Sequence, residues 1–390
     1  MQKWSKFADN MKIKRDINVP LTSFFLFGPR GTGKSTFVKS LITKDTLYID
    51  FLDPDTFRVY AAYPETLIKT VSALNPLKVI IDEVQKVPQI LDVVHKIMEE
   101  RKIQFILTGS GARKLKKEGA DLLGGRALYC RMHPFTASEL GTSFTIEKAL
   151  QTGLIPVVDR SPEPSKTLSA YVDIYLREEI MTEGLVRNLG TFTRFLEIIS
   201  YSHGAVLNVS NIARECQTSR GIVTGYIDIL EDLLLAYRLP VFAKRAKRKT
   251  ASHPKFYLFD NGLYRRLRQR GPLDIESEIS GPALEGLVGQ HLRAYSDFAL
   301  PETKIFYWRS MAGNEVDMVL YGGKTFAAIE VKNAKVLRPT DYNGLTSFGD
   351  DYPEATLILL YRGSVPMVHK NISVVPVELF LKRPQDYVRG

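Results

Sequence analysis

The chain has 390 residues, a net charge of +10 and 25% charged residues. This composition is ordinary for a globular protein, and the length favours two or three domains over one core. The two cysteines, Cys130 and Cys216, lie far apart, which argues against a disulfide framework or a cysteine-rich metal site. No apolar run approaches the roughly 20 residues that span a bilayer, and the N-terminus lacks the apolar core of a signal peptide. We expect a cytoplasmic protein without a membrane partner.

Residues 23–41 predict a buried strand, a glycine-rich loop and a helix. Phe24 to Phe27 form the short apolar run that suits a parallel strand. The loop matches G-x-x-x-x-G-K-[ST], in which glycines let backbone amides surround a phosphate. The lysine can reach the β- and γ-phosphates, and the serine can ligate Mg²⁺. The predicted nucleotide-binding residues are Gly28, Pro29, Arg30, Gly31, Thr32, Gly33, Lys34, Ser35 and Thr36.

Two further apolar runs, Thr46 to Phe51 and Leu77 to Ile81, predict strands beside this loop. The second run is followed by Asp82 and Glu83. A strand that ends in two carboxylates is what a P-loop ATPase needs next to its loop. Asp82 would hold Mg²⁺ through water, and Glu83 would polarise the attacking water as the catalytic residue.

Helical periodicity from Val87 to Arg101 is followed by another strand pattern, Lys102 to Leu107. Thr108 and Ser110 come at the end of this strand, and each is a candidate to lie beside the γ-phosphate. The alternation of strands and helices predicts an α/β fold with a doubly wound parallel sheet and its ligand at the carboxyl ends of the strands. Downstream, Arg113 and Arg126 are candidates for a charge-stabilising arginine, with Arg126 preferred.

The segments GPRGTGKS, IIDEVQKVP, ILTGSGARKL, LLGGR and MHPFTASEL together resemble the AAA-type ATPases that carry a DUF4143 region. The resemblance extends over most of the chain. It implies an ATP-hydrolysing enzyme with ATP and Mg²⁺ as cofactors. It also implies self-association into a ring or another homo-oligomer.

A proline-rich hinge at residues 161–165 suggests a boundary before a middle domain. Helices are predicted at Leu168 to Met181 and Phe192 to Ser202. A short helix near Asn211 to Cys216, a turn and a long helix to about Ala236 then form a helix-turn-helix pattern. The basic run 244–249, followed by a strand at Lys255 to Phe259, would be the wing of a winged helix.

DNA is the expected partner of this middle domain. The long helix offers Arg220 and Thr224 for base edges. It also carries Asp228, Glu231 and Asp232, whose charges would repel phosphate. We therefore expect contact mainly through the basic wing, and the alternative is that the basic run is a solvated turn.

The C-terminal stretch predicts a helix from Gly281 to Phe298 and then three strands. These strands are expected at residues 304–309, 315–321 and 325–332, with a Gly-Gly hairpin turn between the last two. A helix at 339–348 and a strand at 355–361 follow. This order, with Glu285, Asp317 and the Glu330-Val331-Lys332 triplet, resembles the PD-(D/E)XK nuclease fold, although the motif's proline is Val316 here.

The resemblance implies that Glu285, Asp317 and Glu330 bind Mg²⁺, or Mn²⁺ in its place, while Lys332 assists hydrolysis of a phosphodiester. Glu330 and Lys332 are two residues apart on a strand and so share a face. The sequence thus predicts an AAA-type ATPase domain at 1–165, a winged helix at 166–270 and an α/β nuclease-like domain at 271–390. Its predicted function is ATP-driven action on DNA coupled to cleavage. The alternative is a nucleotide-controlled DNA-binding switch that does not cut.

Overall fold

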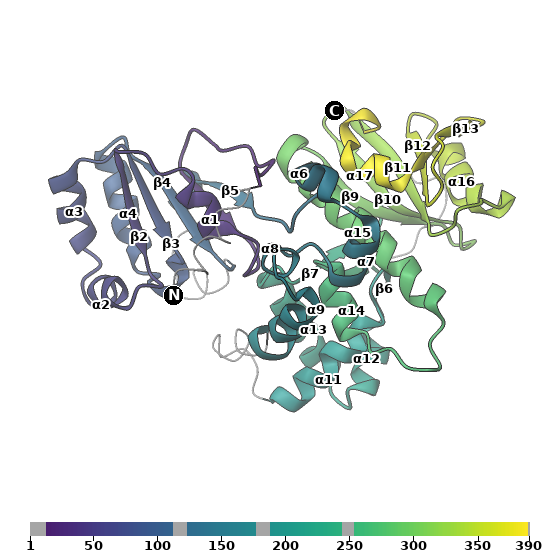
Figure 1. Ribbon diagram of the computed structural model, residues 1–390, viewed down its shortest axis with the longest axis horizontal. Helices are drawn as coiled ribbons and strands as arrows, with labels where there is room; N and C mark the ends of the chain where they lie inside the picture. Colours follow the sequence, from purple (N-terminus) through teal and green to yellow (C-terminus); the bar gives the residue numbers. More distant parts are fainter. Residues whose placement is uncertain (1–12, 112–122, 177–187, 244–252, 389–390) are drawn as a thin grey trace.

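The computed structural model describes residues 13–111, 123–176, 188–243 and 253–388 of the chain. In Figure 1 the N-terminal sheet lies at one end of the molecule, whereas the middle helices and the C-terminal sheet lie together at the other end. The N-terminal, middle and C-terminal parts follow one another along the chain.

The N-terminal part is a five-stranded parallel sheet in the order β2-β3-β4-β1-β5. Phe24 and Leu26 of β1 pack on one face with Val38 of α1, whereas Phe25 and Phe27 pack on the other face with α3 and α4. Because helices cover both faces, the predicted doubly wound sheet is confirmed. The elements are β1 (Phe24–Phe27), α1 (Lys34–Lys39), β2 (Thr46–Asp50), α2 (Pro54–Ala62), α3 (Thr66–Leu74), β3 (Lys78–Asp82), α4 (Ile90–Glu100), β4 (Gln104–Gly109) and β5 (Leu128–Arg131).

The strand boundaries of this sheet differ from the sequence prediction in ways that affect the site. Asp82 is the last residue of β3 rather than the first residue after it, and β4 extends through Thr108 to Gly109. The edge strand β5 was not predicted from the sequence. It is a short edge strand, and three of its four residues are exposed although Leu128 and Tyr129 are apolar, so it differs from the buried strands of the sheet.

The middle part combines helices with a small antiparallel sheet in the order β6-β8-β7. Ile155 and Val158 pack in the same core as Phe192 and Phe195, so residues before the predicted boundary at 165 belong to this core. Its elements are α6 (Ala137–Leu140), α7 (Ile146–Thr152), α8 (Pro156–Asp159), α9 (Pro164–Ala170), α11 (Leu189–Ser200), β6 (Ala205–Val206), α12 (Val209–Glu215), α13 (Arg220–Asp232), β7 (Ala236–Leu239), β8 (Lys255–Leu258) and α14 (Asn261–Leu267).

Two helix predictions in the middle part need correction. The helix expected from Leu168 breaks into α9 and a π-helical turn from Tyr171 to Leu176, and the remainder of that prediction lies outside the described residues. The long helix expected to reach Ala236 ends at Asp232. Leu234 has φ 60° and packs against the core of the first sheet, so the apolar residues after the helix do not continue its face.

The C-terminal part is a six-stranded mixed sheet in the order β13-β14-β12-β11-β10-β9, with α15 and α17 on one face and α16 on the other. The helix α15 packs Leu287 and Leu292 against Met318 and Ile329, whereas α16 packs Phe348 on the opposite face. The strand order confirms the predicted helix, three strands, helix and strand, and adds β13, β14 and α17. The elements are α15 (Glu276–Ala299), β9 (Lys304–Arg309), β10 (Glu315–Gly322), β11 (Thr325–Lys332), α16 (Asn343–Asp351), β12 (Thr356–Tyr361), β13 (Met367–His369), β14 (Ile372–Pro376) and α17 (Val377–Lys382).

Candidate functional site

The glycine-rich loop between β1 and α1 forms a closed turn around the amine of Lys34. Gly31 and Gly33 have φ angles of 74° and 90°, which side chains other than glycine rarely adopt. The Lys34 side chain is buried, and its Nζ donates to the Gly28 carbonyl at 2.7 Å and to the Pro29 carbonyl at 3.2 Å. The loop therefore holds a buried ammonium among backbone groups, as a phosphate-binding loop requires.

The loop is supported by segments far away in the sequence. Arg15 donates from Nη1 to the Thr32 carbonyl at 2.9 Å and from Nε to Glu139 at 2.8 Å. The Tyr171 hydroxyl donates to the Arg30 carbonyl at 3.1 Å. Sequence reasoning missed Arg15 and Tyr171, because neither belongs to the loop motif and nothing in their local sequence marks them.

The carboxyl ends of β3 and β4 bring Asp82, Glu83 and Thr108 together beside the loop strand β1. Asp82 is fully buried and accepts hydrogen bonds from the Thr108 hydroxyl and, at 2.8 Å, from the Tyr48 hydroxyl. The backbone amide of Glu83 donates to Thr108 Oγ1 at 3.0 Å. Burial, followed by the neighbouring Asp82 charge, raises the pKa of Tyr48 far above its usual value, so this phenol stays a donor.

Glu83 is held in place by a residue that the sequence did not single out. Gln85 lies in the 3₁₀ turn from Val84 to Lys86, and its Nε2 donates to Glu83 at 2.5 Å and to Ser110 Oγ at 3.2 Å. Glu83 itself adopts a left-handed backbone with φ 61°. Gln85 Oε1 is buried without a hydrogen-bond partner among the described residues.

These residues fit a nucleoside triphosphate with its Mg²⁺. A Cβ on Gly28 would lie 2.5 Å from the Met132 carbonyl oxygen, so only glycine fits at the start of the loop. Ser35, in the first turn of α1, and Asp82 are the residues that would hold the ion. Because both Asp82 oxygens already accept hydroxyl protons, Asp82 is suited to contact the ion through water.

The arginine candidates are not brought to this site within the described part of the chain. Arg126 pairs with Glu99 of α4 at 3.1 Å, and its side chain is 44% exposed. Arg113 lies outside the described residues. Thr36, on the first turn of α1, is exposed, so the loop ends its buried contacts at Ser35.

A second cluster of charges forms where α15, β10 and β11 meet. It contains the predicted residues Glu285, Asp317 and Glu330. The fourth predicted residue, Lys332, lies with its Nζ 2.5 Å from Glu330 Oε1 on the shared strand face. The structure thus brings together all four residues that the PD-(D/E)XK resemblance selected.

The cluster also contains Lys255, the first residue of β8, which the sequence did not single out. Its Nζ lies 2.9 Å from Glu285 Oε1 and 3.2 Å from Asp317 Oδ1, and it also pairs with Glu315 at 2.5 Å. Burial lowers the pKa of Lys255, but the surrounding carboxylates, Glu285 foremost, raise it well above its ordinary value. Lys255 is therefore a buried cation.

Burial has strong effects on the acids of this cluster. Burial and the charge of Asp317 raise the pKa of Glu285 to about 7. Burial and the same charge raise the pKa of Glu330 well above its ordinary value. Four acids, including Glu315, crowd this site, and the two lysines offset only part of their mutual repulsion.

The residues of this cluster do not fit a divalent metal ion in the arrangement described. Asp317 accepts from Lys255 through Oδ1 and from the Val331 amide through Oδ2 at 2.8 Å, and Glu285 Oε1 accepts from Lys255 and from the Tyr257 hydroxyl. Within the described part of the chain, no group of three or more His, Cys, Asp or Glu side chains is positioned to hold a metal.

The helices α12 and α13 meet at a short turn, with the three-stranded sheet beside them. Arg220 Nη1 donates to Ser210 Oγ at 3.5 Å. On the other side of α13, Arg238 of β7 pairs with Asp228 at 2.9 Å and with Glu231. Two of the acids expected to repel phosphate therefore share one arginine within the fold, which offsets one of their two charges. The basic run 244–249 lies outside the described residues.

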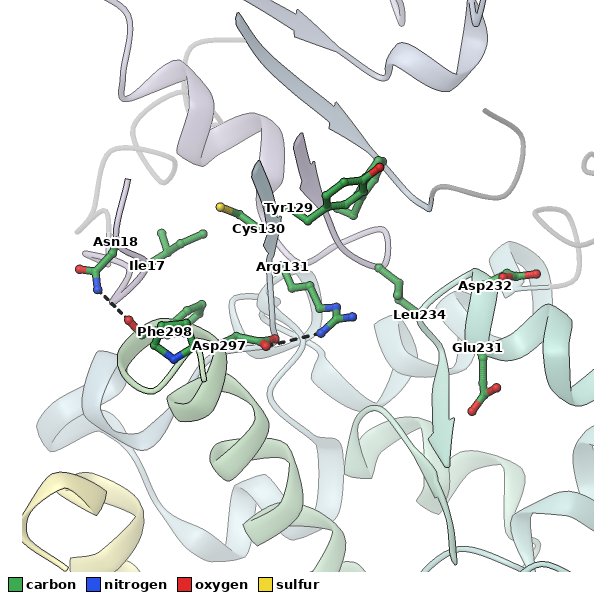
Figure 2. Close-up of a pocket in the computed structure, with 12 residues that line it drawn as sticks. Ile17, Asn18, Tyr129, Cys130, Arg131, Glu231, Asp232, Leu234, Asp297 and Phe298 are labelled. Atoms are coloured by element: carbon green, nitrogen blue, oxygen red, sulfur yellow. Dashed lines mark hydrogen bonds and ion pairs between the residues drawn. The ribbon is translucent and has the colours of Figure 1, made fainter. Parts of the chain in front are cut away.

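Figure 2 shows a cavity of about 410 Å³ between β5, the end of α15 and the turn after α13. Arg131 of β5 lies 3.4 Å from Asp297 of α15, and His133 Nε2 lies 2.7 Å from the same carboxylate. None of residues 28–36 lines this cavity. It marks the junction of the three parts of the molecule rather than the nucleotide loop.

Comparison with known families divides the chain into three matched stretches. Residues 22–141 match the model described as AAA domain. Residues 144–274 match a domain of unknown function, DUF8612, and residues 280–380 match a domain of unknown function, DUF4143. The first and last matches fall on the two stretches in which the sequence resemblance was recognised.

Comparison with individual proteins gives more distant likenesses. An uncharacterized protein of Haemophilus influenzae is 25% identical over 215 residues, which are 50% of this chain and 54% of that protein, so the chain spans about half the length of this curated relative. The structure of the Aeropyrum pernix ORC1 protein in complex with DNA is 13% identical, with a TM-score of 0.25, and covers 67% of this chain and 87% of that chain. A TM-score this low supports no conclusion about fold or function. Among the described helices, none is both long and apolar enough to cross a membrane.

Proposed function

Starting from a P-loop ATPase domain of the AAA type followed by a DUF4143 region, we propose that this chain hydrolyses ATP to control how its middle part holds DNA. One observation carries the ATPase: the phosphate-binding loop with Lys34 follows β1, and Asp82-Glu83 end β3, at the same carboxyl edge of one parallel sheet, with only β4 between the two strands. In this arrangement Lys34 binds the phosphates, Ser35 and Asp82 hold the Mg²⁺ ion, and Glu83 polarises the attacking water. The bound Mg²⁺ neutralises charge on the phosphates.

The proposed roles divide between holding the nucleotide and aligning the water. The loop binds through its backbone amides and the Lys34 ammonium. Glu83 is fixed by Gln85 and by its own amide bond to Thr108. Thr108 and Ser110 belong to the same hydrogen-bonded group as Glu83. Loss of the γ-phosphate on hydrolysis would therefore alter the hydrogen bonds at the end of β4. We assign Arg126 no part within one chain, and a role between subunits of an oligomer is what the AAA resemblance implies.

The proposal for DNA rests on the middle part. The order α12, turn and α13, followed by the antiparallel pair β7 and β8, is the order of elements in a winged helix and supports this proposal. Arg238 pairs with both Asp228 and Glu231 and offsets one of their two negative charges, which weakens the electrostatic objection to bringing α13 near a phosphate backbone. The basic run 244–249 joins β7 to β8 in the sequence and adds positive charge to the wing.

A magnesium-dependent nuclease is the second candidate function. The convergence of Glu285, Asp317, Glu330 and Lys332 on one site favours it. The position of Lys255 among these carboxylates opposes it. We therefore place the non-cutting, nucleotide-controlled switch first.

The test is ATP turnover by the full chain with and without duplex DNA. Lys34→Ala should lose nucleotide binding, and Glu83→Gln should bind ATP normally while its kcat falls by about 100-fold or more. Glu100→Gln, on the exposed end of α4, is the matched control and should hydrolyse ATP like the wild type. If Glu83→Gln keeps the wild-type kcat, Glu83 is not the residue that polarises the water. If duplex DNA leaves the rate of ATP turnover unchanged, the proposed coupling of ATP hydrolysis to DNA binding is wrong.

A further inference from the structure

The Lys255 ammonium forms ion pairs with three carboxylates and donates hydrogen bonds to two of them, Glu285 and Asp317. An ammonium group has three protons, and Glu285, Asp317 and Glu315 each lie within 3.2 Å of its nitrogen. The side chain is 2% exposed, so water does not share these contacts. Lys255 is therefore fully coordinated by acids that come from a helix and a strand of another part of the fold.

The place of the ammonium is the place where the predicted metal ligands converge. Asp317 and Glu285 each direct an oxygen at Lys255 Nζ. A divalent ion bound by the same two oxygens would lie about 2.0–2.6 Å from each. The ammonium and a metal ion cannot both occupy this space.

Lys255 does not serve as the lysine of the nuclease motif, because that position is already filled. Lys332 follows Glu330 by two residues and lies beside it on β11, as the motif requires. Lys255 comes instead from β8, which belongs to the small sheet of the middle part. The cluster therefore contains one lysine more than a PD-(D/E)XK site uses.

We propose that Lys255 takes the place of the divalent ion in the C-terminal carboxylate cluster, which thereby binds the β8 strand of the middle part instead of a catalytic metal. This inference deepens the proposed switch and rests on its non-cutting C-terminal part, but it is independent of ATP hydrolysis. The Lys255 ammonium is the cation at this site, and its ion pairs connect the β8 strand of the proposed wing to the nuclease-like sheet.

The test is a Mn²⁺ titration of the nucleotide-free full chain, followed by electron paramagnetic resonance. Lys255→Gln removes the charge and should gain one Mn²⁺ site that binds at least about 10-fold tighter than any site in the wild type. Lys255→Gln combined with Asp317→Asn should lose this site. Lys332→Gln is the matched control, because it removes the other lysine of the cluster, which is partly exposed, and it should not gain the site.

Two results would overturn the proposal. One is a folded Lys255→Gln protein, by circular dichroism, that gains no Mn²⁺ site. The other is a Mn²⁺ site that the wild type already has and that Asp317→Asn or Glu330→Gln removes. The comparison of the wild type with these two variants tests the proposal even if Lys255→Gln does not fold. ATP turnover of Lys255→Gln, measured in parallel, should stay within about 2-fold of the wild type, since Lys255 does not contact the nucleotide loop. Failure of the metal test thus remains distinct from failure of the ATPase assignment.

Discussion

Gln85 fixes the orientation of the Glu83 carboxylate at the end of β3. Its amide nitrogen joins Glu83 and Ser110, so it ties the end of β3 to the end of β4. A general base must be held within hydrogen-bond reach of its water, and the partner that holds it contributes through position rather than through chemistry.

We expect Gln85→Ala to lower kcat for ATP by about 10-fold while KM changes by less than about 3-fold, because Glu83 loses its orienting donor but the loop is untouched. Steady-state kinetics would measure both constants. Gln151→Ala, at an exposed position on α7, is the control. A rise in KM with unchanged kcat would show instead that Gln85 contacts the nucleotide.

The loop residues and Asp82-Glu83 could be found from the sequence because phosphate binding fixes both residue type and spacing within one short segment. Gln85 and Tyr48 could not be found in this way. Tyr48 reaches Asp82 only because β2 and β3 are neighbours in the sheet. The periodicity of a single strand does not predict which strands are neighbours. Lys255 was missed for the same reason, since its partners lie 30 or more residues away.

At the scale of elements, α15 contacts all three parts of the molecule. Glu285 lies in the C-terminal cluster, whereas Asp297, near the other end, pairs with Arg131 and His133 beside the first sheet. Between them, His291 Nδ1 donates to the Leu287 carbonyl at 2.8 Å, and His291 Nε2 accepts from the Ala137 amide at 2.9 Å. Only the neutral ring satisfies both contacts.

Burial lowers the pKa of His291 to about 4. The unfolded chain, with an ordinary histidine pKa near 6.5, binds the proton first as the pH falls, so stability is lost between about pH 6.5 and 4. At pH 5 the loss amounts to about 2 kcal/mol from this residue. His291→Gln should show a correspondingly smaller loss in urea unfolding between pH 7 and pH 5.

The control for this pH experiment is His369→Gln, at an exposed position on β13. It should lose as much stability as the wild type between pH 7 and pH 5. The same loss in His291→Gln would show that the acid sensitivity comes from other buried groups, of which His203 is one, because burial lowers its pKa to about 3.

The helices and strands that the sequence predicted well are those with a long apolar face, such as α4 and β11. Predictions failed where apolar residues pack on a different part of the fold. Leu234 continues the apolar pattern of α13, yet it leaves the helix to pack against the first sheet. The exposed strands β5 and β13 are short edge strands of four and three residues, too short for a periodic pattern to mark them in the sequence.

At the scale of the whole molecule, the proposed DNA-binding helix ends against the proposed ATP site. Gly111 follows Ser110 at the end of β4, and a Cβ on Gly111 would lie 2.4 Å from the Asp232 carbonyl oxygen at the end of α13. The backbone after β4 is in direct contact with the backbone at the end of α13, so we expect a movement of the β4 end to displace α13. This contact gives the proposed switch a physical path from the γ-phosphate to DNA.

Gly111→Ala tests that path. The added methyl group must separate β4 from α13, so we expect DNA to stimulate ATP turnover by less than about half as much as in the wild type, with ATP affinity within about 3-fold. Turnover at several DNA concentrations and a fluorescent-nucleotide titration would measure the two effects. Gly281→Ala, where a Cβ meets no atom within 4 Å, is the matched control and should respond to DNA like the wild type. If Gly111→Ala folds and keeps the full response, the junction of β4 and α13 does not carry the signal. Other contacts of the first part then become the candidate routes, among them Arg131 with Asp297 of α15 and Tyr171 with the Arg30 carbonyl.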